Sequence, residues 1–146
     1  MRLSIGITHL TPAWEILLKQ IAPPFEILSP EIEWTPNNYS CIITSGRLDH
    51  FGVERLLSFV NMGGSILSET DAAEQLFNTR STSYFINYIN TENDSIFEAV
   101  SSGFIGCQLS VPNNATLTQD THGKKLIEFK KVGQGQILVL PGGLVN

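Results

Sequence analysis

Residues 39–71 read YSCIITSGRLDHFGVERLLSFVNMGGSILSETD, and the architecture of the whole chain can be worked out from this stretch. It alternates between apolar and amphipathic segments: an apolar run at 41–44, a polar loop at 45–50, a helical pattern at 53–62, a Gly63-Gly64 break and a second apolar run at 65–68. Short, uninterrupted apolar runs are typical of strands covered on both faces, as in parallel sheets. The stretch therefore predicts one strand-helix-strand crossover.

The helix expected at 53–62 has a single apolar face. Its apolar residues follow the i, i+3, i+4, i+7 spacing of one helical stripe, namely Val53, Leu56, Leu57 and Val60. Gly63 suits the left-handed backbone that commonly ends a helix. In open parallel sheets, ligands bind outside the carboxyl ends of the strands. The loops at 45–50 and 69–71 are therefore where we expect a site.

The segments before the crossover continue the pattern. We expect a strand near residues 3–7, a helix capped by Thr11 with Pro12 as its first residue, and a second strand at 25–28. The apolar stripe of this helix should contain Trp14, Leu17, Leu18 and Ile21. We interpret the Pro- and Asn-bearing residues 29–38 as a connection.

A short helix is expected directly after the crossover, at residues 71–77. Thr70 or Asp71 would cap it, with Glu74 completing a capping box if Asp71 is the cap. Its inward side chains would be Ala73, Leu76 and Phe77.

Strands dominate the rest of the chain. We expect them at 84–89 and 104–111, with a short helical piece at 96–100 between the two. Residues 125–132 alternate apolar and charged side chains, and residues 137–140 are fully apolar. The Gly133-Gln134-Gly135 turn joins these segments, so they predict an antiparallel hairpin whose second strand enters the core.

This order of elements predicts one α/β domain that spans residues 1–146. The expected architecture is a three-layer α/β/α sandwich, with a mostly parallel sheet, helices on both faces and a C-terminal antiparallel hairpin. A length of 146 residues and a hydrophobic content of 42% suit a domain of this size. The abrupt end after a strand and Gly142-Gly143 favours an excised part of a longer chain.

Composition argues against several kinds of partner. The chain has nine Lys and Arg and a net charge of −5, so it lacks the concentrated basic face that nucleic-acid binding needs. No apolar stretch approaches the ~20 residues of a membrane span, and no secretion signal is visible. We therefore expect a cytoplasmic protein that binds neither nucleic acid nor a membrane.

The Cys and His residues do not predict a metal site or a cofactor. Cys41 and Cys107 have no metal-type spacing, and Cys41 should behave as a small hydrophobic residue inside its strand. His9, His50 and His122 fall in three separate loops, without a ligand-type spacing to one another. We expect ordinary solvated histidines there.

The chain resembles the class I glutamine amidotransferase-like superfamily, which has a flavodoxin-like fold. YSCIITSG at 39–46 looks like that superfamily's strand and Gly-bearing oxyanion loop, and GGSILSET at 63–70 is similar to the strand that leads into its nucleophile elbow. HGKKLIEFKKVGQGQILVLPGG at 122–143 resembles the closing hairpin of divergent members. Some of those members precede a polysaccharide deacetylase or glycosidase domain in carbohydrate-processing proteins.

The sequence departs from that superfamily at both catalytic positions. The elbow of an active amidotransferase carries a Cys whose thiolate attacks the amide carbon, with a His nearby to take the proton. Here the elbow reads Ser68-Glu69-Thr70-Asp71, and the late His-x-Glu is replaced by Leu140-Pro141-Gly142-Gly143. The resemblance therefore implies the fold without glutamine hydrolysis.

Five residues remain as candidates for a ligand site: Ser45, Arg47, His50, Glu69 and Thr70. Glu69 ends a strand expected to be central, where its carboxylate needs solvent or a donor; it would either contact a ligand or form an ion pair with Arg47. Thr70 would either cap the next helix or act as a nucleophile, with His50 as base and Asp49 or Asp71 orienting that base.

Two functions follow. The first is a non-catalytic, amidotransferase-like accessory or binding module, plausibly within a polysaccharide-processing protein, whose partner is a neighbouring catalytic domain or a small-molecule ligand. The alternative is a hydrolase with a non-cysteine site formed by Glu69, Thr70 and His50. Because the Cys and His of the amidotransferases are absent, we expect no catalysis in this domain.

Overall fold

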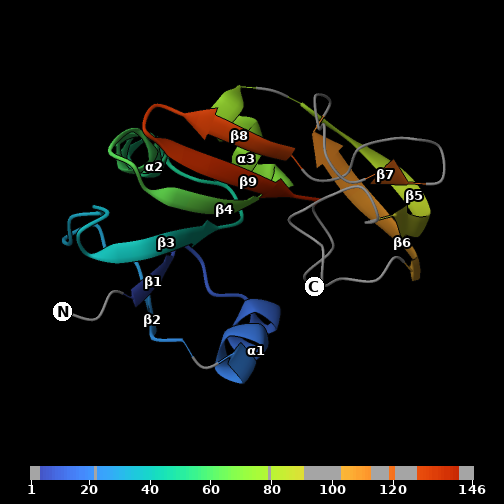
Figure 1. The fold of residues 1–146 in the computed structure, drawn as a ribbon, viewed down its shortest axis with the longest axis horizontal. Coiled ribbons are helices and arrows are strands. Elements are labelled where there is room, and N and C mark those ends of the chain that lie inside the picture. The colour runs from blue at the N-terminus through green and yellow to red at the C-terminus, as the bar shows by residue number, and fades with distance from the viewer. Residues whose placement is uncertain are drawn as a thin grey trace.

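A six-stranded sheet lies at the centre of the computed structural model, which describes residues 4–21, 23–78, 80–90, 103–112, 119–120 and 128–141 (Figure 1). The strand order is β2-β1-β3-β4-β9-β8. The strands are β1 Ser4–Ile7, β2 Phe25–Ile27, β3 Tyr39–Thr44, β4 Ser65–Glu69, β8 Glu128–Val132 and β9 Gly135–Leu140. All neighbours pair in parallel except β8 and β9, which are antiparallel. The predicted parallel sheet with a C-terminal hairpin is confirmed.

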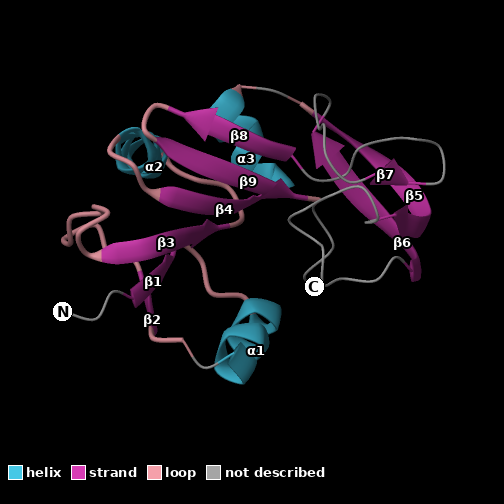
Figure 2. Ribbon diagram, in the orientation of Figure 1, coloured by secondary structure: helices cyan, strands magenta, loops and turns pink. Residues whose placement is uncertain are grey.

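Helices cover both faces of this sheet (Figure 2). The alternation of side chains along a strand separates the two sides, because Ile42 and Ile43 of β3 belong to different core clusters. Ile43 packs with Trp14 and Leu18 of α1 (Pro12–Ile21). Ile42 packs with residues of α2 (His50–Asn61) and α3 (Thr70–Phe77). The predicted three-layer sandwich is therefore confirmed.

Local capping explains where α1 and α2 begin and where α2 ends. Thr11 Oγ1 accepts a hydrogen bond from the Trp14 amide at 3.3 Å, as the sequence predicts. Helix α2 begins at His50, three residues earlier than predicted, because Asp49 Oδ1 accepts from the Gly52 amide at 2.6 Å. Gly63 follows the helix with a φ of 102°, the left-handed conformation expected of it.

The helix faces differ in part from the predicted stripes. In α1, Trp14 and Leu18 are buried, whereas Ile21 is 67% exposed. In α2, Phe59 is fully buried and was missing from the predicted stripe.

The cap of α3 was predicted wrongly. The N-cap residue is Glu69, without a side-chain cap hydrogen bond, while Thr70 and Asp71 lie inside the helix. Strand β4 runs directly into α3, so its last residue, Glu69, occupies the cap position, and the carboxylate of Glu69 accepts from Trp14 instead of from the helix.

A second, three-stranded sheet has the order β6-β5-β7. It contains β5 Ser81–Asn90, β6 Gly103–Pro112 and β7 Gln119–Asp120, which pair antiparallel, so the strands expected at 84–89 and 104–111 are confirmed. Both β5 and β6 lie against α3. The short helical piece expected at 96–100 lies outside the described residues.

The C-terminal hairpin places its lysines at the edge of the main sheet. Strand β8 is the last strand in the order, and Lys130 and Lys131 are exposed on it, which is an arrangement that discourages further strand pairing. Gly133 forms the turn with a φ of 57°. None of the helices in the described part of the chain is long and apolar enough to cross a membrane.

Candidate functional site

The loop between β3 and α2 is fixed to helix α3 by side-chain hydrogen bonds. Asp71 Oδ2 accepts from the Gly46 amide at 2.9 Å. Gln75 makes two bonds to Leu48, since its Oε1 accepts from the Leu48 amide at 2.6 Å and its Nε2 donates to the Leu48 carbonyl at 2.7 Å. The loop that carries Arg47 is therefore held on both sides of that residue.

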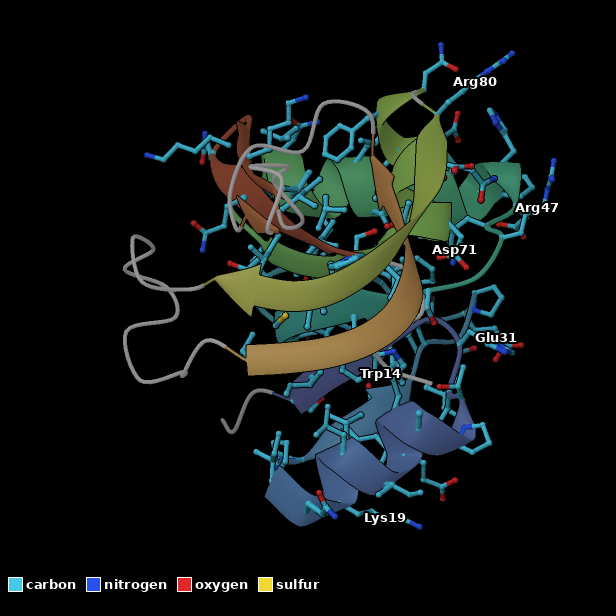
Figure 3. All side chains as sticks on the ribbon, turned by 90° about the vertical axis from the view of Figure 1, so that its right-hand side faces the viewer. Trp14, Lys19, Glu31, Arg47, Asp71 and Arg80 are labelled. Atoms are coloured by element: carbon cyan, nitrogen blue, oxygen red, sulfur yellow. The ribbon has the colours of Figure 1, made fainter. Side chains whose placement is uncertain are left out.

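Glu69 lies beneath helix α1 and is 8% exposed. Its carboxylate accepts a hydrogen bond from Trp14 Nε1 at 3.2 Å, and Figure 3 places Trp14 between α1 and the sheet. Burial raises the pKa of this carboxyl; the Trp14 bond opposes the rise, and the negative charge of Asp71 adds to it. The predicted ion pair between Glu69 and Arg47 is wrong, because the indole of Trp14 is the donor.

Ser45 directly follows Thr44, the last residue of β3, which pairs with Ser68 next to Glu69; Ser45 is 3% exposed. The Ser45 hydroxyl lies close enough to the Glu69 carboxyl to lower its pKa slightly. It does not reach ordinary hydrogen-bond geometry with any of the described residues. Ser45 and Glu69 are therefore brought together by the fold, in a buried position under α1 rather than in an open cavity.

The buried carboxyl of Glu69 gives a prediction about stability and pH. Folding raises the pKa of this carboxyl, so the unfolded chain ionises first as the pH rises. The folded state therefore loses stability relative to the unfolded chain. This loss is absent below the pKa of the unfolded chain, grows above it and is complete once the pH has passed the folded pKa. Glu69→Gln removes the charge and keeps an acceptor for Trp14. We expect this variant to unfold at higher urea concentration than the parent at about pH 8, with the difference disappearing near about pH 3.5.

The exposed carboxyl of Glu31 provides the matched control for that experiment. Glu31→Gln makes the same chemical change at a solvated position. Equal pH dependence of unfolding in the two variants would contradict the role assigned to burial of Glu69.

Thr70 is not placed as a nucleophile. Its hydroxyl donates to the Leu140 carbonyl at 3.0 Å, and the residue is 1% exposed. A nucleophile elbow is a sharp, strained turn. Here Glu69 has φ −76° and ψ 162°, which is relaxed extended backbone, and among the described non-glycine residues a positive φ occurs at Asn78. The turn from β4 to α3 therefore lacks the geometry that exposes a nucleophile.

His50 also lies away from the predicted constellation. It is exposed at the first turn of α2, where its Nε2 is 3.1 Å from Glu54 Oε1 and its ring lies 6.3 Å from that of Phe51. These are its contacts in the described part of the chain, so His50 is not paired with Thr70 or Glu69. The base-nucleophile pair required by the hydrolase hypothesis is not formed.

An open groove of about 610 Å³ lies instead at the carboxyl ends of β1, β2 and β3. Its walls come from the segments that follow these strands and from the first turns of α2, with the lining residues Thr8, Leu28, Pro30, Trp34, Arg47, Leu48, Asp49, Phe51, Gly52 and Arg55. Of the five candidates named from the sequence, Arg47 lines this groove. The position of a groove at this edge agrees with the rule for open parallel sheets.

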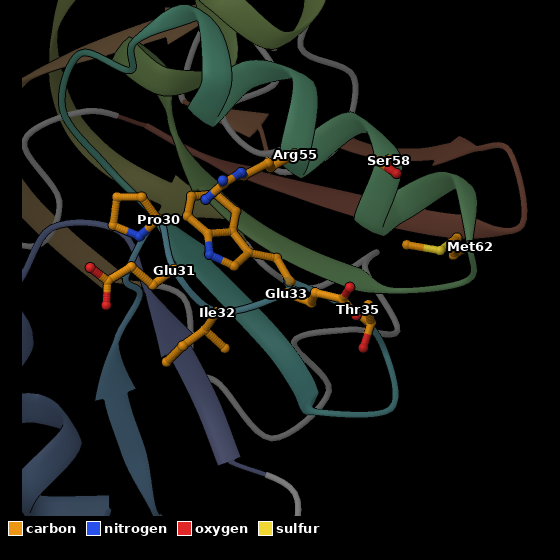
Figure 4. Close-up of a pocket in the computed structure, with 9 residues that line it drawn as sticks. Pro30, Glu31, Ile32, Glu33, Thr35, Arg55, Ser58 and Met62 are labelled. Atoms are coloured by element: carbon orange, nitrogen blue, oxygen red, sulfur yellow. The ribbon is translucent and has the colours of Figure 1, made fainter.

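A smaller pocket of about 360 Å³ adjoins the groove and shares Pro30, Trp34 and Arg55 with it. Figure 4 shows the two sides of this pocket, with Glu31 and Glu33 on the connection before β3, Arg55 on α2 and Met62 directly after α2. The guanidinium carbon of Arg55 lies 5.4 Å from the centroid of the Trp34 ring. Trp34 Nε1 donates to the Ser29 carbonyl at 3.1 Å, which fixes the ring.

Trp34 and Arg55 were not identified from the sequence. The segment at 29–38 was interpreted as a connection, and the signal that could have singled out Trp34 is a large aromatic residue in an otherwise polar, Pro-bearing loop. Arg55 occupies an ordinary polar position of the helix pattern. In the described residues, no three His, Cys, Asp or Glu side chains gather as a metal site would require.

Comparison with known proteins gives structural neighbours. No family model matches the chain, and no curated protein matches it. Among solved structures, the β-galactosidase from Bacillus circulans sp. alkalophilus is similar over 95% of this chain and 29% of its own, with a TM-score of 0.68 and 15% identity. The exo-β-1,4-mannosidase from Opitutaceae bacterium strain TAV5 is similar over 96% of this chain and 31% of its own, with a TM-score of 0.63 and 16% identity.

A third neighbour is comparable with this chain in length. PurLQS from Thermotoga maritima is similar over 97% of this chain and 87% of its own, with a TM-score of 0.57 and 8% identity. By contrast, the chain spans about a third of the length of the two glycosidases. At these identities the likeness concerns the fold, which is an α/β sandwich.

Proposed function

We propose that this chain is a non-catalytic, amidotransferase-like module of a carbohydrate-processing protein, which binds a small ligand or a neighbouring catalytic domain. The observation that carries the proposal is the turn from β4 to α3. Where an amidotransferase would present its nucleophile, Glu69 is buried against Trp14 and the Thr70 hydroxyl donates to the Leu140 carbonyl. A turn whose polar side chains are hydrogen-bonded within the fold in this way stabilises the structure and presents no nucleophile.

The carbohydrate context has separate support. The fold of this chain is similar to segments that make up about a third of a β-galactosidase and of an exo-β-1,4-mannosidase. The sequence resemblance points the same way, because divergent amidotransferase-like domains accompany glycosidase domains. The similarity to PurLQS is consistent with an amidotransferase-like scaffold.

Turnover assays test the absence of catalysis. We expect no release of ammonia from glutamine, and no release of nitrophenol from p-nitrophenyl acetate or a p-nitrophenyl β-galactoside, above the rate with denatured protein. The variants Glu69→Gln, Thr70→Val and His50→Ala should behave like the parent chain. His9→Ala is the matched control for His50→Ala, since both histidines are exposed. Turnover that is lost in Glu69→Gln or His50→Ala and kept in His9→Ala would refute the proposal.

A ligand screen tests the binding role. Thermal unfolding is followed with neutral sugars, sugar acids, sugar phosphates, amino acids and nucleotides, because a ligand that binds the folded state raises the unfolding temperature. We expect stabilisation by at least one of the neutral sugars, sugar acids or sugar phosphates. Stabilisation by amino acids alone would contradict the carbohydrate context.

A further inference from the structure

The groove of about 610 Å³ lies where the order of strands changes direction. The chain passes from β1 to its neighbour β2 on one side, whereas β3, the other neighbour of β1, leads to β4 on the opposite side. The adjacent ends of β1 and β3 are joined by two bonds, from the Thr8 amide to the Ile43 carbonyl at 3.0 Å and between the Thr8 and Thr44 hydroxyls at 3.0 Å. The groove therefore has a fixed floor at the topological switch point.

Two guanidinium groups line this groove. Neither Arg47 nor Arg55 forms an ion pair with a carboxylate of the described residues, although the chain as a whole has a net charge of −5. Asp49 is the acidic residue of the lining; its carboxylate accepts from the Gly52 amide, and its one negative charge leaves the two arginines in excess. Two arginines that are not paired with a carboxylate of the described residues give the groove an affinity for anions, even though the protein as a whole is acidic.

The rest of the groove wall is largely apolar. Leu28, Pro30, Leu48 and the rings of Trp34 and Phe51 line it, and Phe51 is 68% exposed. The Trp34 ring is held by the Arg55 guanidinium and by the Ser29 carbonyl. Such a wall suits the flat or apolar face of a ring, and the volume lies within the range of about 300–1,000 Å³ that small-molecule sites occupy.

The geometry points to a site for a small organic anion in this groove: a phosphate or carboxylate held by Arg47 and Arg55, on a sugar ring that lies against Trp34 and Phe51. This inference deepens the proposed function by naming the ligand class. The adjoining pocket, which Arg55 also lines, contains Glu31 and Glu33 and would repel an anion, so the anionic group lies in the larger groove, which both Arg47 and Arg55 line. Figure 3 shows Arg47 at the periphery of the molecule, where a ligand can reach it.

Tryptophan fluorescence reports binding directly, because Trp34 lines the groove while Trp14 is buried beneath α1. The chain is titrated at low ionic strength with glucose 6-phosphate, glucuronate and glucose. We expect saturable changes with at least one of the two anions and at least about tenfold weaker binding of glucose. A preference between phosphate and carboxylate then identifies the anionic group. The signal should disappear in Trp34→Phe.

Charge-removing variants locate the site. Arg47→Gln and Arg55→Gln should each raise the Kd for the anion at least about tenfold, and Arg55→Lys should restore part of the loss because it keeps the charge. Arg47 is exposed, so its substitution leaves the core intact. Lys131→Gln removes one positive charge at the far edge of the sheet and should leave the Kd unchanged.

Three results would overturn the anion site: no saturable change with either anion, equal binding of glucose, or equal loss of affinity in Arg47→Gln and Lys131→Gln. Binding of glucose with the same Kd as the anions would refute the anion site and leave a carbohydrate-binding module standing. The turnover assays above test the absence of catalysis independently. Failure of the ligand assignment and failure of the proposed function are therefore distinguishable.

Discussion

Phe59→Ala is expected to lower the free energy of unfolding by about 3–5 kcal/mol. Phe59 has no exposed surface and belongs to the core cluster between α2, α3 and the sheet. Its ring lies directly over Gly64, where an added Cβ would come within 2.3 Å of Phe59 Cε1. Truncation removes apolar contacts and leaves a cavity that the rigid backbone at Gly64 cannot fill. Urea unfolding at neutral pH measures the effect.

Phe51 supplies the matched control on the same helix. It is 68% exposed, so Phe51→Ala should change the free energy of unfolding by less than about 0.5 kcal/mol. A similar loss in the two variants would show that the packing described for α2 is incorrect.

Gly135→Ala is expected to destabilise the fold by about 3 kcal/mol, at the upper end of overpacking effects. A Cβ at this position would lie 2.2 Å from the Gly64 carbonyl oxygen and 2.3 Å from the Val60 carbonyl oxygen. Both are backbone atoms, one in the last turn of α2 and one directly before β4, so relieving the overlap requires β9 to move away from them. The same urea titration gives the change in stability.

Gly46→Ala is the control for this substitution. Gly46 has a φ of 76°, but a Cβ there would meet nothing within 4 Å. Its cost should be the backbone strain alone, about 1–2 kcal/mol. If Gly46→Ala proves as damaging as Gly135→Ala, close approach of backbones does not explain the glycine at 135.

The elements that could be predicted from the sequence are those with local determinants. The crossover from β3 to β4 follows from two apolar runs, one amphipathic stripe and Gly63, all within about thirty residues. Pro12 and Thr11 marked the start of α1 in the same way. The start of α2 was predicted too late because the sequence of its first turn, with the exposed His50 and Phe51, does not show the apolar period of a helix.

The site depended on contacts that no local pattern encodes. The donor to Glu69 is Trp14, which lies 55 positions earlier in the chain. The sequence pointed instead to Arg47, because its loop follows the strand expected next to that of Glu69. A site was expected at loops 45–50 and 69–71, and Arg47 of the first loop does line the groove, but the lining also includes Thr8, Leu28 and Trp34 and no residue of 69–71. These residues become neighbours only once β1, β2 and β3 have paired.

The position of β9 inside the main sheet has a consequence for how the chain acquires its structure. Strand β9 lies between β4 and β8, and the side chains of Gln136 and Ser65, which are 71 positions apart, bond across the β4–β9 pair. Pairing over such a sequence separation raises contact order and slows folding. During synthesis on the ribosome, β4 therefore keeps an unpaired edge until residues 135–140 have emerged. In that interval the nascent chain is open to strand addition by other polypeptides.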